Sequence, residues 1–137
     1  MIFTSYFAKI KKFPPNVTPI AITAVVPNWY KGLAYSYLAP KYDILMKYKD
    51  DHNEADYIEC FNNTTLKHLN PLRVLADLRI VLGHDGDDES IPPFWENPDV
   101  HVALICYEKP TDFCHRHLVA AWLRNYGVEC KEWEEET

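Results

Sequence analysis

The sequence predicts an α/β fold, a three-layer Rossmann-like sandwich with a mostly parallel sheet. Two continuous apolar runs, residues 19–26 and 100–107, have the composition of strands that are covered on both faces. Segments with helical periodicity lie between these runs and after the second one, and strands that alternate with helices pair in parallel. The length of 137 residues suits one domain over residues 1–137.

The predicted strands are bounded by turn-forming residues. The first covers residues 2–10 and ends before Pro14 and Pro15, which exclude regular structure. The buried run over residues 19–26 is the second, and a loop with Trp29 follows it. The central strand covers residues 100–107, and the alternating residues 128–133 form the last.

The predicted helices are marked by their ends. Residues 42–49 form a first helix, Asn53 caps the next, and Asn70 precedes one that has Pro71 in its first turn and ends before Gly83. Asp112 is expected to cap a helix over residues 112–126. The element order is therefore β-β-α-α-α-β-α-β.

Composition limits the function classes. A formal charge of −6 argues against general nucleic-acid binding, because such binding depends on Lys and Arg. The acidic residues 85–89 and 129–136 are interpreted as a solvated loop and tail. No signal peptide or membrane-length apolar segment is present, so a cytoplasmic protein with four reduced cysteines and no membrane contact is expected.

Reactive and anion-binding residues are concentrated where the central strand ends and the following helix begins. The strand ends in Cys106-Tyr107-Glu108-Lys109, and Cys114-His115-Arg116 opens the helix. Ligands of open α/β folds bind at the carboxyl ends of strands and against helix N-termini. The junction from Cys106 to Arg116 is therefore the predicted site.

This junction resembles the signature of the DUF488 family, a Leu-Leu-Cys-x-Glu strand end followed by a Cys-His-Arg helix start. The matching residues are 104–109, 114–118 and 122–123. The first strand, with Ser5 and Tyr6, and the loop with Trp29 resemble the family only approximately, and Ala24-Val25-Val26-Pro27 replaces its Asp-Val-Arg element. The resemblance implies a Rossmann-like fold in a small intracellular protein, and no particular reaction.

The residue types suggest roles with alternatives. Arg116 and the helix N-terminus suit a phosphate or carboxylate, and the alternative for Arg116 is a salt bridge to Glu108 or Asp112. Glu108 is an acid–base candidate or a partner that orders a cation. Cys114 is a candidate nucleophile, a ligand contact or a packing residue. It does not pair with His115 in a regular helix, where adjacent side chains point apart.

Further ligand contacts are expected from a group of residues around the junction. They are Ser5, Tyr6, Trp29, Cys106, Lys109 and His115. Trp29 supplies a stacking wall for a base, or alternatively a lid packed on the domain.

Two classes of function follow from these residues. The first is a binder of, or enzyme acting on, a phosphate-bearing ligand such as a nucleotide or nucleic-acid end. The second is a non-catalytic protein-interaction module with a structural Cys-His-Arg junction. No metal or cofactor is expected. Two alternatives stay open at the junction: Cys106 and Cys114 form a redox pair, or they form a zinc site together with His115. The spacing of these three residues differs from that of the usual zinc motifs.

Overall fold

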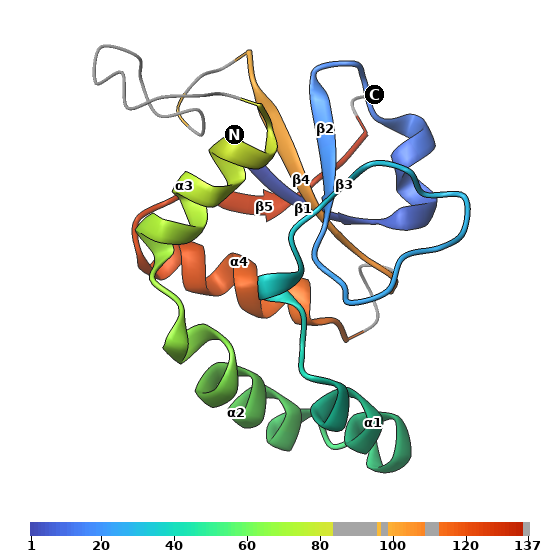
Figure 1. Ribbon diagram of the computed structural model, residues 1–137, viewed down its shortest axis with the longest axis vertical. Helices are drawn as coiled ribbons and strands as arrows, with labels where there is room; N and C mark the ends of the chain where they lie inside the picture. Colours follow the sequence, from blue (N-terminus) through green and yellow to red (C-terminus); the bar gives the residue numbers. More distant parts are fainter. Residues whose placement is uncertain (84–95, 97–98, 109–112, 136–137) are drawn as a thin grey trace.

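A five-stranded parallel sheet organises the chain. The computed structural model describes residues 1–83, 96, 99–108 and 113–135. The strands are β1 (Ile2–Tyr6), β2 (Val17–Ala21), β3 (Leu33–Ala34), β4 (His101–Cys106) and β5 (Cys130–Glu132). They lie in the order β3-β2-β4-β1-β5, and every pairing is parallel (Figure 1). The predicted α/β fold is confirmed.

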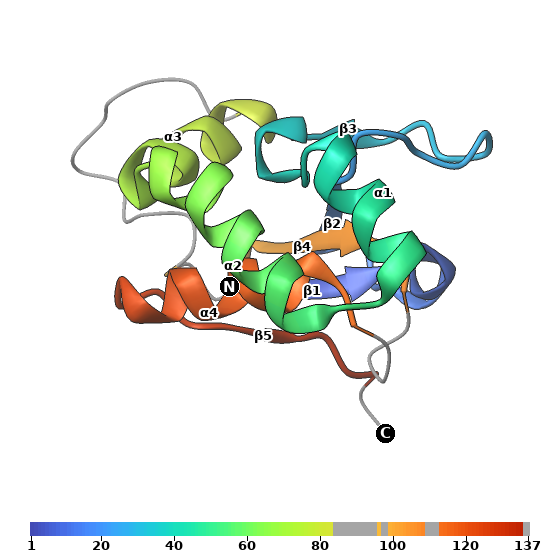
Figure 2. The same ribbon diagram turned by 90° about the horizontal axis from the view of Figure 1, so that it is seen from below.

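The four α-helices of the described residues lie on one side of this sheet (Figure 2). They are α1 (Tyr42–Asp51), α2 (Glu54–Thr64), α3 (Pro71–Val81) and α4 (His115–Asn125). Val102 and Leu104 of the central strand β4 contribute to the core between this face and the helices. Ala103 and Ile105 contribute to a second core on the other face, which the 3-10 helix η1 (Phe7–Lys12) covers. Strand alternation explains why β4 serves both cores and is apolar from Val102 to Cys106.

Local helix signals in the sequence are confirmed. The Asn53 side chain accepts a hydrogen bond from the Asp56 amide at 3.1 Å and caps α2. The Asn70 side chain accepts one from the Leu72 amide at 2.9 Å and caps α3. Side-chain oxygens at these positions satisfy amides that lack partners within the helix, so both caps were predictable from local sequence.

Several predicted boundaries were wrong. The first strand ends at Tyr6 because residues 7–12 turn into η1, and residues 22–26 leave the sheet after β2. Short elements add β3 and the 3-10 helices η2 (Ser36–Leu38) and η3 (Leu66–His68). The predicted cap Asp112 and acidic segment 85–89 lie outside the described residues.

The last helix begins later than its sequence predicted. Cys114 has extended backbone angles of φ −153° and ψ 145°, so it is the N-cap of α4, and His115 is the first helical residue. Gly127 follows the helix at a φ of 99°, a conformation that favours glycine. Within the described residues, none of the helices combines the length and apolarity needed to cross a membrane.

Candidate functional site

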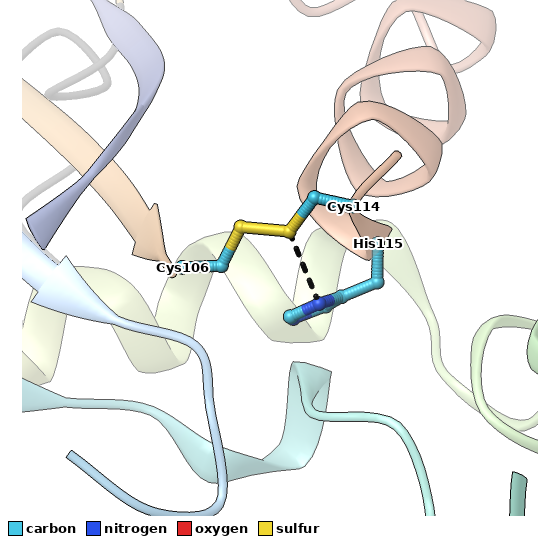
Figure 3. A group of neighbouring side chains, drawn as sticks. All are labelled: Cys106, Cys114 and His115. Carbon is cyan, nitrogen blue, oxygen red and sulfur yellow. Dashed lines mark hydrogen bonds between the residues drawn. A yellow bond between two sulfur atoms is a disulfide. The ribbon is translucent and has the colours of Figure 1, made fainter. Parts of the chain in front are cut away.

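The two cysteines of the predicted junction meet at the carboxyl end of β4. Cys106 is the last residue of β4, and Cys114 caps α4. Their sulfurs are joined in a disulfide, with the Cα atoms 7.3 Å apart (Figure 3). The expectation that all four cysteines are reduced was wrong for this pair, because the fold brings the strand end against the helix start. Cys60 and Cys130 are free.

His115 lies directly beside this pair. Its Nδ1 atom is 3.7 Å from Cys114 Sγ (Figure 3). Its Nε2 atom is 2.8 Å from the Ile22 carbonyl oxygen. A carbonyl only accepts hydrogen bonds, so the Nε2 atom carries the hydrogen and Nδ1 has a free lone pair. The prediction that Cys114 and His115 point apart was wrong, because Cys114 has extended rather than helical backbone geometry.

Burial keeps His115 uncharged. Removal of the ring from water lowers its pKa to about 4, opposed by the hydrogen bond to Ile22 and reinforced by the positive charge of Arg116. The ring also packs edge-on against Phe61, with the centroids 5.7 Å apart. The imidazole at this site is therefore a neutral base at physiological pH.

Arg116 is fully buried, and its guanidinium is surrounded by acceptors. Its Nε and Nη2 atoms donate to the two carboxylate oxygens of Glu132 at 3.0 and 2.9 Å. Its Nη1 atom donates to Cys106 Sγ at 2.9 Å and to the Glu108 carbonyl oxygen. The face of the Tyr6 ring lies against the guanidinium, with the ring centroid 5.7 Å from Arg116 Cζ. Arg116 thus connects β4 and β5, and it offers no exposed surface to a ligand.

Glu132 is the residue of this site that the sequence reasoning missed. The interpretation of residues 129–136 as a solvated tail is wrong for this position. Glu132 lies in β5 and also accepts a 2.7 Å hydrogen bond from the Thr4 hydroxyl. Val128 and Cys130 are buried, and the period of two places Glu132 on the same face. That alternation was the available signal.

The other predicted site residues are only partly brought together. Tyr6 pairs with Cys106 in the sheet register and contacts Arg116. Ser5 is fully buried, and strand alternation places it on the opposite face from Tyr6. The Glu108 residue is exposed, and only its carbonyl group is used by Arg116. Lys109 lies outside the described residues.

Apolar side chains, two of them aromatic, form an exposed surface at the same end of the sheet, where the strands have their carboxyl ends. We call Val25, Trp29 and Tyr107 the edge patch; they are 72%, 59% and 47% exposed. The Tyr107 hydroxyl donates to the Val25 carbonyl oxygen at 2.9 Å. Phe7 connects the two rings, with centroid distances of 6.1 Å to Trp29 and 4.8 Å to Tyr107. Tyr107 was not predicted as a site residue, although it directly follows Cys106.

The edge patch and the start of α4 lie at the same, carboxyl end of the sheet. Ile22 precedes the loop that carries Trp29, and its carbonyl oxygen contacts His115, the first residue of the helix. The Cys114 side chain makes no capping hydrogen bond, and the first turn of α4 contains no acidic residue. The positive end of the helix dipole is thus not offset by a carboxylate of its own first turn.

The fold and the site define the chain as an α/β protein with a buried Cys-His-Arg cluster at the carboxyl edge of a parallel sheet. Comparisons with family models, with curated proteins and with solved structures find no match.

Proposed function

We propose that this protein binds a phosphate-bearing ligand with a base, a nucleotide or a nucleic-acid end, at the carboxyl edge of the sheet. The observation that supports this proposal is that the exposed Trp29 and Tyr107 rings and the first turn of α4 lie at the same, carboxyl end of the sheet. Exposed rings stack on bases, and helix N-termini bind phosphate. In open parallel sheets, this edge is where ligands bind.

The proposed ligand contacts differ in part from those expected from the sequence. Trp29 and Tyr107 stack on the base, and the backbone amides at the start of α4 receive the phosphate. Arg116 acts indirectly, because its buried guanidinium holds the Glu108 carbonyl and Cys106 in place. Lys109 remains a sequence-based candidate for charge neutralisation. Ser5 is fully buried and is not assigned a contact.

A protein-interaction module is the second candidate, and burial of the junction favours it. Cys106, Cys114 and Arg116 have almost no exposed surface, as expected for a structural junction. The edge patch would then contact a protein partner, since exposed apolar side chains mark interaction sites. Membership of the DUF488 family remains a prediction under either candidate.

Calorimetric titration distinguishes the two candidates. We expect a purine mononucleotide, or a dinucleotide phosphorylated at its end, to bind more tightly than the nucleoside or inorganic phosphate alone. Trp29→Ala is expected to weaken nucleotide binding about 5- to 150-fold, because stacking contributes about 1–3 kcal/mol per base. The two phosphorylated ligands also separate a mononucleotide site from a site for a nucleic-acid end.

The matched control is Tyr126→Ala. Tyr126 is 45% exposed, close to the value for Tyr107, but it follows the opposite end of α4. Nucleotide affinity should not change in this variant. Absence of binding by every phosphorylated ligand, or equal losses in the Trp29 and Tyr126 variants, would contradict the ligand proposal and favour the interaction module.

A further inference from the structure

Three potential metal ligands converge at the junction. The Sγ atoms of Cys106 and Cys114 and a ring nitrogen of His115 lie within 4.8 Å of one another, and all three residues are buried. Among the described residues, this is the one group of three His, Cys, Asp or Glu side chains with such a geometry. Cys106 ends β4, and Cys114 and His115 stand at the start of α4 (Figure 3). The strand and the helix therefore hold the backbone of all three potential ligands in place.

His115 is oriented as a metal ligand. Histidines that bind a metal through one ring nitrogen usually donate a hydrogen bond from the other, often to a backbone carbonyl. Here Nε2 donates to the Ile22 carbonyl oxygen at 2.8 Å, and Nδ1 faces the Cys114 sulfur at 3.7 Å. The hydrogen bond to Ile22 therefore fixes the orientation of the ring and places its hydrogen on Nε2, which leaves Nδ1 to bind a metal.

The cysteine positions also suit a shared ion. The Cα atoms are 7.3 Å apart, whereas disulfides usually span about 4.4–6.8 Å. Two thiolates that bind one ion need no direct bond between their sulfurs, so they accept this wider separation. Two thiolates, one neutral imidazole and a divalent cation carry no net charge, which suits a buried site. Arg116 donates to Cys106 Sγ and contributes a second-sphere hydrogen bond.

We propose that the reduced form of this cluster binds one zinc ion through Cys106 Sγ, Cys114 Sγ and His115 Nδ1. Two molecules of a thiol, or one of a dithiol, transfer two electrons and two protons to the protein disulfide, are oxidised to a disulfide of their own, and leave two protein thiols. Zinc then displaces the two thiol protons and binds two thiolates. Three protein ligands leave a fourth position for water or a ligand, as in catalytic rather than structural zinc sites. The disulfide form cannot bind zinc in this way.

Metal titration of the full chain tests this proposal. The protein is reduced with a phosphine, separated from the reductant without air, and titrated with zinc against a coloured chelator. We expect one equivalent of zinc per reduced chain and none for the oxidised chain. Cobalt should give thiolate-to-metal charge-transfer absorption and the intense ligand-field bands of a tetrahedral site. A reduced wild-type chain that binds no zinc would overturn the proposal.

Substitutions assign the ligands. Cys106→Ser and Cys114→Ser preserve side-chain shape, and each should weaken zinc binding on the order of 100-fold or more, because even second-sphere changes cost about 10- to 100-fold. Cys60→Ser is the control, since Cys60 is free and lies in α2. Circular dichroism of the metal-free forms separates lost ligands from lost folding. Zinc affinity that is unchanged in folded Cys106→Ser or Cys114→Ser variants, or lost in Cys60→Ser, would contradict this site.

Discussion

Replacing Arg116 with alanine is expected to lower the free energy of unfolding by about 3 kcal/mol or more. Removal of one partner of a buried ion pair typically costs about 3–5 kcal/mol, because the remaining charge loses its compensation. Glu132 would keep only the Thr4 hydroxyl among its described partners, and Cys106 Sγ and the Glu108 carbonyl would lose their donor. The partial exposure of Glu132, 22% of its side chain, places the expected loss in the lower part of that range.

Urea denaturation of wild type and variant measures this loss. The control is Arg73→Ala, which removes an ion pair with Asp77 on the surface of α3, where the Arg73 side chain is 80% exposed. Surface pairs of this kind contribute about 0.2–1 kcal/mol, so the control should stay close to wild type. Equal losses in the two variants would show that Arg116 is not the buried connection between β4 and β5.

The second large effect is a loss of stability in acid that depends on His115. The folded protein holds the pKa of His115 near 4, against 6.5 for an ordinary histidine. As pH falls below about 6.5, the unfolded chain takes up a proton at this residue while the folded chain does not, so protonation favours unfolding. The contribution is fully present above about pH 6.5 and is lost as pH falls to about 4, and it amounts to about 3 kcal/mol.

Denaturation across this pH range, with a chelator present, isolates the contribution. His115→Gln is expected to remove about 3 kcal/mol of the acid-dependent loss, because glutamine does not titrate. His68→Gln is the control, since His68 is exposed in η3. The rest of the acid loss, from other titrating groups, should be common to all three proteins. If His115→Gln loses as much stability in acid as wild type, the buried neutral imidazole is not responsible.

Short-range features of the fold could be predicted from the sequence. The caps Asn53 and Asn70 depend on a side chain and an amide two or three residues away, so local sequence is sufficient. The apolar composition of β4 identified the central strand for a similar reason. The first strand was predicted too long, because Phe7–Lys12 contains no Pro or Gly to mark its end, and packing of Phe7 in the second core accompanies the turn.

The site was predicted in position but not in its contacts. The strand end and helix start follow from local patterns, so the Cys106–Arg116 junction could be located. The partner of Arg116 could not, because Glu132 reaches it only through the pairing of β5 with β1. The contact between Cys114 and His115 depends on the helix start, which lies three residues after the predicted cap Asp112.

The order of the strands has a consequence during synthesis on the ribosome. β1 lies between β4 and β5, and these neighbours begin at residues 101 and 130. The emerging chain can pair β2 with β3 early, but β1 has neither of its sheet neighbours until β4 (His101–Cys106) has been made. Contacts between such distant segments slow folding. β1, which carries Ile2, Phe3 and Tyr6, therefore stays unpaired until then, and unpaired strands of this kind are prone to aggregation and are bound by chaperones.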